Sequence, residues 1–267
     1  MGHVLDLSFM FFQAILLFLA TLLGGLVVLL MPRFGPAAFR LVLAFTGSYL
    51  FSIIFLHLLP DLFSWHASAT RMGLYVLLGF FLQLFLEFFS KGVEHGHLYE
   101  EGHEVQLRGL SPLALLAALC IHAFMDGVIL GPVFSLASHD AHDALHAHHT
   151  HSPYRLLVGM VLHKVSEAFA LVTVLRKLGQ QRASILLYML CVALASPLGL
   201  WLSVHGSQYF FLTSEGLVSL AAVAGGSFLY IATTIFFEAI PHDQLNAARL
   251  AATLAGAGLV VCLEFLL

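Results

Sequence analysis

Two segments of the chain each place a histidine and a carboxylate four residues apart. One segment contains His122 and Asp126, and the other contains His163 and Glu167. Residues four apart lie on the same face of an α-helix. Two imidazoles and two carboxylates together form a ligand set that suits a divalent transition metal. The sequence therefore predicts one metal site built from these four residues, provided that two helices bring the pairs together.

Both pairs lie near the middle of long apolar segments. Ionisable groups at membrane depth are costly, and they commonly mark an ion or substrate path. Alternatives stay open for the first pair, since His122 could be a hydrogen-bonded packing residue or could relay protons with Asp126. The second pair, His163 with Glu167, favours the metal interpretation.

The composition indicates a membrane protein. Of 267 residues, 60% are hydrophobic and 10% are charged, with a mean hydropathy of +0.94. Soluble domains have about 45–50% apolar and about 25% charged residues. We expect residues 1–267 to form a single transmembrane transporter domain, an all-α polytopic bundle whose surroundings are the lipid bilayer. The net charge of −4 gives no indication of a nucleic-acid partner.

Eight apolar segments are long enough to be membrane-spanning helices, which need about 20 residues each. Proline-containing breaks separate most of them. The predicted spans are 9–31, 38–59, 72–90, 111–135, 154–175, 183–204, 214–238 and 244–267. The first lacks the basic flank and small-residue cleavage site of a signal peptide, so we expect it to be retained.

The distribution of Lys and Arg predicts the orientation. Eight of these residues fall in alternate loops on one side, and Arg71 and Arg155 fall on the other. Basic loops face the cytoplasm, so both termini should lie outside a plasma membrane or a bacterial inner membrane. Spans 111–135 and 154–175 then run in opposite directions, which brings the two His–carboxylate pairs to a similar depth.

Two connecting segments are rich in histidine. Residues 138–152, predicted to lie outside, contain six histidines, and residues 91–108, predicted to lie inside, contain several beside glutamates. Such tracts bind metal weakly, so the outer one could capture metal and the inner one could receive it. The alternative is that both are solvated polar loops without a required role.

Three further polar residues lie near the predicted site or along a path to it. Lys164 could form a salt bridge with Asp126 or Glu167, or its ammonium could occupy space where a second cation would bind. His57 and Asp61, at the outer end of the second span, could form an entrance funnel or an interfacial cap.

These motifs resemble those of the ZIP (Zrt/Irt-like) family of divalent-metal transporters. His122-x3-Asp126-Gly127-x3-Gly131 resembles the fourth-helix motif of the family, and His163-x3-Glu167-Ala168 resembles the fifth. Phe55–Asp61 is similar to the end of the second helix, and Gly226–Ile231 is similar to part of the seventh. The resemblance implies a ZIP-like bundle of eight helices in which one bundle moves against another by an elevator-like or rocking motion.

The resemblance has departures. Many family members carry a second metal position beside the first, and the residues matching its ligands here are Ala123, Lys164 and Ser196. The primary position is retained, but the second lacks its ligands and one of them is replaced by a cation.

Together these features predict uptake of a divalent transition metal toward the cytoplasm. Zn²⁺ is the first choice, and Fe²⁺, Mn²⁺ and Cd²⁺ remain alternatives because N/O sites overlap in preference. No resident cofactor and no enzymatic activity are expected, and a homodimer is compatible with the sequence. The alternative is an intramembrane metal-dependent hydrolase or oxidase that uses the same ligands to activate water or oxygen.

Overall fold

The computed structural model describes residues 2–30, 36–64, 68–90, 110–140, 153–209, 213–239 and 246–266. These residues are almost entirely helical, which confirms the all-α prediction. The helices are α1 (Gly2–Leu30), α2 (Pro36–Ile53), a π-helical turn η1 (Ile54–Leu58), α3 (Leu59–Ser64), α4 (Ala69–Ser90), α5 (Pro112–Asp140), α6 (Pro153–Lys177), α7 (Arg182–Tyr209), α8 (Ser214–Ala239) and α9 (Ala247–Leu266).

Each predicted span corresponds to a long helix or a helical run. Seven stretches of the described residues are long and apolar enough to cross a membrane, and the eighth predicted span appears as a shorter apolar helix over Ala247–Leu263. The second predicted span, 38–59, ends in the π-helical turn η1 and continues through α3 to Ser64. The chain is therefore a multi-pass integral membrane protein.

The structure describes only a small part of the two predicted histidine-rich loops. Helix α5 continues to Asp140, so the backbone of the first residues of the predicted outer loop 138–152 is helical. The rest of that loop and the predicted inner loop 91–108 lie outside the described residues.

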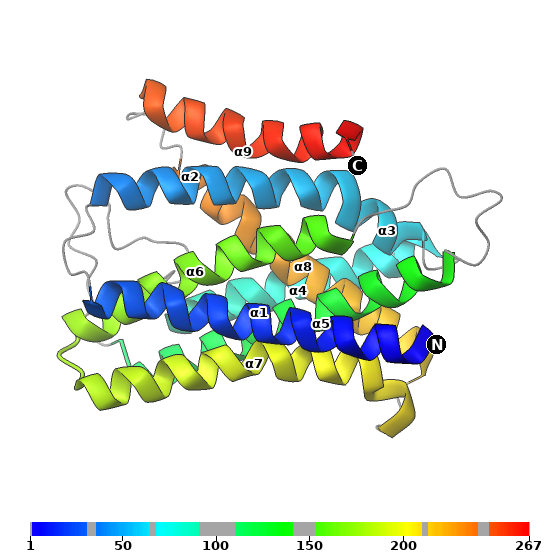
Figure 1. The fold of residues 1–267 in the computed structure, drawn as a ribbon, viewed down its shortest axis with the longest axis horizontal. Helices are drawn as coiled ribbons and strands as arrows, with labels where there is room; N and C mark the ends of the chain where they lie inside the picture. The colour runs from blue at the N-terminus through cyan, green and yellow to red at the C-terminus, as the bar shows by residue number, and fades with distance from the viewer. Residues whose placement is uncertain are drawn as a thin grey trace.

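The long helices of the described residues, labelled in Figure 1, form two groups of four, which are defined by the helices that pack most extensively on one another. We call α1, α5, α6 and α7 the first group, because α5 packs most extensively on α7 and α1 packs on α6 and α7. We call α2, α4, α8 and α9 the second group, because α4 packs on α8 and α2 packs on both α9 and α8. The groups meet mainly where α5 contacts α8 and α4 and where α2 contacts α6.

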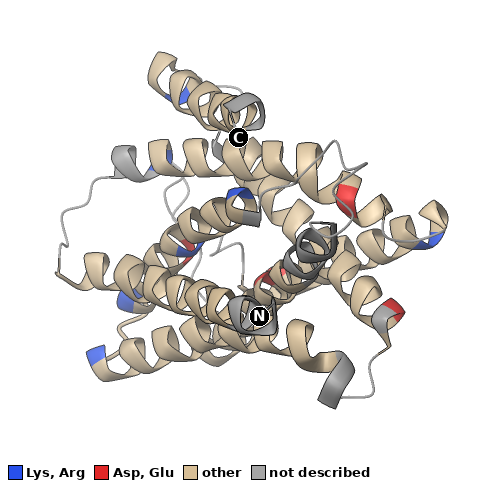
Figure 2. Ribbon diagram, turned by 45° about the vertical axis from the view of Figure 1, so that its right-hand side comes forward, with Lys and Arg blue, Asp and Glu red and all other residues tan. Residues whose placement is uncertain are grey.

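The outer surface of the bundle is rich in apolar side chains, which agrees with a membrane environment. Large apolar side chains such as Phe88, Leu113 and Leu254 are exposed to the surroundings, as expected for residues that face lipid rather than water. Charged positions are sparse along the ribbon (Figure 2). Helix α1 begins at the end of the bundle where α9 ends (Figure 1).

Candidate metal centre

The four predicted ligands meet inside the first group. His122 and Asp126 come from α5, and His163 and Glu167 come from α6. One potential ligand atom from each of the four lies within 4.8 Å of all the others. All four side chains are at most 2% exposed. The spacing of four residues puts both members of a pair on one helical face, and the contact between α5 and α6 joins the two faces.

The distances within the cluster suit a small cation. His122 Nε2 lies 3.3 Å from His163 Nε2, 3.3 Å from Asp126 Oδ2 and 3.9 Å from Glu167 Oε1. Metal–ligand bonds of 2.0–2.2 Å in a tetrahedron separate ligand atoms by roughly 3.3–3.6 Å. The donor set of two nitrogens and two carboxylate groups therefore fits a divalent transition metal with little rearrangement.

Lys164 is part of the same cluster. Its ammonium lies 2.6 Å from Asp126 Oδ2 and 2.6 Å from Glu167 Oε2, and its side chain is fully buried. One alternative from the sequence was a salt bridge of Lys164 with one of these acids, and the structure has an ion pair with both. The ammonium thus contacts two of the four groups that would ligate a metal.

The positions that depart from the family pattern bring no further charge to the cluster. Ala123 is fully buried in an apolar cluster, and Ser196 is a buried residue of α7 whose carbonyl oxygen packs against Gly127. Among the described residues, the four-residue cluster is the one group of three or more His, Cys, Asp or Glu side chains close enough to hold an ion.

His57 and Asp61 are not members of this cluster. His57 lies in η1 and is buried, and its Nε2 is 3.4 Å from Arg155 Nη1 in the first turn of α6. Asp61 lies in α3 and is partly exposed. In this conformation the Arg155 guanidinium contacts His57, for which the sequence left open an entrance funnel or an interfacial cap.

Arg155 was counted among the loop charges in the sequence analysis, whereas the structure buries it. Its side chain is 6% exposed, and its carbonyl oxygen accepts a hydrogen bond of 2.8 Å from the Tyr49 hydroxyl. The apolar residues after Arg155 did signal a helix. The contact of its guanidinium with His57, 98 residues away in the chain, has no signal in the local sequence.

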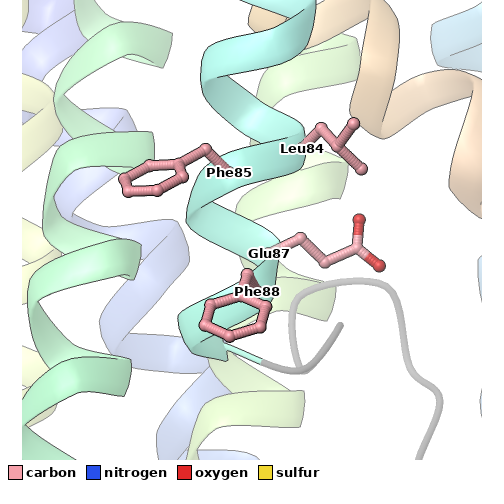
Figure 3. Close-up of a pocket in the computed structure, with 4 residues that line it drawn as sticks. All are labelled: Leu84, Phe85, Glu87 and Phe88. Carbon is pink, nitrogen blue, oxygen red and sulfur yellow. The ribbon is translucent and has the colours of Figure 1, made fainter.

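A surface pocket of about 720 Å³ lies near the C-terminal end of α4, and none of its lining residues belongs to the metal cluster. Leu84, Phe85, Glu87 and Phe88 line it, and the Glu87 side chain points away from the two phenylalanines (Figure 3). The Glu87 carboxylate accepts a hydrogen bond from the Tyr230 hydroxyl of α8.

Comparison with known proteins identifies related sequences. The family model described as ZIP zinc transporter matches residues 94–264, which is more than half of the chain. Similar proteins include Zinc transporter ZIP9 of Micropogonias undulatus, 28% identical over 61% of this chain and 49% of that protein. Zinc transporter ZIP9-B of Xenopus laevis is 30% identical over 61% of this chain and 50% of that protein. The chain thus aligns with about half the length of these curated relatives.

Proposed function

Because the chain belongs to the ZIP zinc transporter family, we propose that it carries a divalent transition metal, with Zn²⁺ as the first substrate, across the membrane toward the cytoplasm. The observation that carries the proposal is the buried cluster of His122, Asp126, His163 and Glu167. A buried set of nitrogen and oxygen ligands between the spanning helices would replace the hydration shell that a metal ion loses when it leaves water.

The family resemblance predicted from the sequence is confirmed by the match to the family model. Members of this family are transporters rather than enzymes, so the same ligands serve to bind a passing ion. The alternative of an intramembrane hydrolase or oxidase is therefore set aside. The substrates Fe²⁺, Mn²⁺ and Cd²⁺ remain open, because the cluster has the N/O ligands that all of them accept.

The four ligands have different roles in binding. The neutral imidazoles of His122 and His163 donate nitrogen lone pairs, while the carboxylates of Asp126 and Glu167 supply the negative charge that attracts the ion. His57 and Asp61 are proposed to lie on the outer approach to the cluster. The contact of His57 with Arg155 would have to open for metal to pass it in that direction.

Transport requires the cluster to face each side of the membrane in turn. We propose that the first group moves relative to the second, since all four ligands and Lys164 belong to the first group. The distribution of Lys and Arg favours an orientation in which both termini lie outside. The positions of α1 and α9 in Figure 1 are compatible with termini on one side.

Uptake of radioactive zinc into proteoliposomes tests this function. Asp126→Ala and His163→Ala should each abolish saturable uptake, because each removes one of the four ligands of a buried site. His205→Ala is the matched control: it removes a half-buried helical imidazole that lies outside the cluster and contacts the Trp201 carbonyl oxygen. Normal uptake by both cluster variants would show that the ion crosses elsewhere.

A further inference from the structure

The strongest unexplained feature of the cluster is the placement of the Lys164 ammonium. A fully buried ammonium is costly unless it is paired, and here two carboxylate oxygens lie 2.6 Å from it. The two acids also belong to the proposed ligand set. A residue that merely stabilised the helix packing would have no need to contact both anionic ligands.

Metal and ammonium compete for the same oxygens. Asp126 Oδ2 is the atom 2.6 Å from Lys164 Nζ, and it is also the carboxylate oxygen 3.3 Å from His122 Nε2. A metal bound between His122 and this oxygen would lie a few ångströms from the ammonium. Two cations this close in a site shielded from water repel each other strongly, so both cannot hold Asp126 Oδ2 together.

We propose that Lys164 is a tethered counter-cation that alternates with the transported metal. Without metal, its ammonium neutralises part of the charge of Asp126 and Glu167, as in this structure. When the metal binds, the ammonium withdraws from Asp126, and when the metal leaves, the ammonium returns. The inference rests on the proposed function and identifies the residue that sets how tightly the metal is held.

This exchange has consequences for transport. The ammonium opposes metal binding and assists metal release, so it lowers affinity and accelerates turnover. It also keeps one positive charge beside the acids when the site is empty, which lowers the cost of moving two carboxylates through a membrane interior. The space and charge that it occupies restrict the cluster to a single metal.

Lys164→Met tests the proposal, because methionine approximates the length of the lysine stem without its charge. Zinc bound by the purified full chain is measured relative to Asp126→Ala, so that zinc bound elsewhere cancels. We expect Lys164→Met to bind zinc about tenfold more tightly or better, since a nearby cation is removed. In proteoliposomes the KM for zinc should fall and the maximal rate should also fall.

Ser166→Ala is the matched control on the same helix. Ser166 is buried, and its hydroxyl donates to the carbonyl oxygens of Leu162 and His163 of its own helix. Its replacement should leave the zinc affinity unchanged. Weaker or unchanged zinc binding by Lys164→Met, with saturable uptake by the unmodified chain and none by Asp126→Ala, would overturn the exchange while leaving the proposed function in place. Absence of saturable zinc uptake by the unmodified chain would instead remove the proposed function.

Thermal unfolding keeps the test decisive if the variant is unstable. Without metal, Lys164→Met should have a lower Tm than the unmodified chain, because two acids lose their counter-ion. Zinc should then raise its Tm more than it raises that of the unmodified chain. Folding of Lys164→Met only in the presence of zinc would likewise support the exchange. Failure to fold even with zinc, while Ser166→Ala folds, would assign Lys164 a structural role and overturn the proposal.

Discussion

Contacts inside each helix group differ in kind from contacts between the groups. At several glycines inside the groups, helices approach until backbones touch: a β-carbon at Gly127 would overlap the Ser196 carbonyl oxygen, and one at Gly79 would overlap the Val223 carbonyl oxygen. Between the groups, glycines face side chains. Gly225 faces Ile129 Cδ1, which would lie 3.4 Å from an added β-carbon.

The difference indicates which contacts can change during transport. Backbones in direct contact leave no space for rearrangement, so each group should behave as a unit. Side chains at the boundary can change rotamer and allow the groups to slide or rock. Arg155 of the first group makes two polar contacts across the boundary. One is with Tyr49 of α2, and the other is with His57 of η1, the turn that follows α2. The metal cluster lies wholly in one group and would travel with it.

The largest effect is expected where a backbone contact inside a group is broken. Gly127→Ala should lower the Tm of the purified protein strongly and reduce the amount of folded protein, because the Ser196 carbonyl oxygen cannot move aside as a side chain can. Overpacking of this type costs about 1–3 kcal/mol or more. Gly225→Ala, at the boundary between the groups, should cost less, since the Leu62 and Ile129 methyl groups that it meets can move.

Gly258→Ala is the control for both glycine variants. Among the described residues, no atom outside the neighbouring turns of α9 lies within 4 Å of a β-carbon at that position, and alanine is the better helix former by about 1 kcal/mol. Its Tm should be unchanged or slightly raised. Equal losses in Gly127→Ala and Gly225→Ala would contradict the difference between the two kinds of contact.

A disulfide across the boundary should stop transport without unfolding the protein. In a chain with Cys120, Cys191 and Cys262 replaced, cysteines are placed at Ile129 of α5 and Gly225 of α8, which face each other across the boundary: a β-carbon at Gly225 would lie 3.4 Å from Ile129 Cδ1. If the groups move relative to each other, oxidation should abolish zinc uptake, and a reductant should restore it.

The control for the boundary disulfide is a pair inside one group. A β-carbon at Gly25 of α1 would lie 3.1 Å from Val172 Cγ2 of α6, and both helices belong to the first group. Cysteines at these positions should cross-link on oxidation with uptake preserved. Loss of uptake in this pair and retention in the boundary pair would reverse the assignment of the moving unit.

The parts of the site that sequence could predict are those set by local spacing and by the membrane. The pairs His122 with Asp126 and His163 with Glu167 follow from the helical period. Their similar depth follows because α5 and α6 are consecutive spans that run in opposite directions. A bilayer admits helices and closed barrels as spanning structures, and this chain has long apolar segments that suit helices. The spans could therefore be predicted from the length of the apolar segments alone.

Long-range contacts could not be predicted in the same way. A salt bridge of Lys164 with Asp126 or Glu167 was one alternative from the sequence, but the ion pair with both acids depends on how α5 and α6 pack. Arg155 contacts Tyr49 and His57, which both lie about 100 residues earlier in the chain. The division into two groups depends on which helices pack most extensively on one another. A glycine that meets backbone also looks the same in the sequence as one that meets a side chain.

The smallest expected effect comes from two neighbouring hydroxyls on α2 that face different groups. Tyr49 donates a 2.8 Å hydrogen bond to the Arg155 carbonyl oxygen across the boundary, and Ser48 donates a 2.7 Å bond to the Thr253 carbonyl oxygen inside the second group. Each bond contributes about 0.5–1.5 kcal/mol. Ser48→Ala should therefore lower the Tm slightly, with no effect on the balance between conformations.

Tyr49→Phe should instead shift that balance, because its bond holds the groups in the arrangement of this structure. The rate at which the Ile129–Gly225 cysteine pair oxidises measures how much of the protein has this arrangement. Loss of a bond worth about 1 kcal/mol should slow that rate by about two- to tenfold, whereas Ser48→Ala should leave it unchanged. Equal rates in the two variants would mean that the Tyr49 bond persists in every conformation the protein adopts, and Arg155 would then move together with α2.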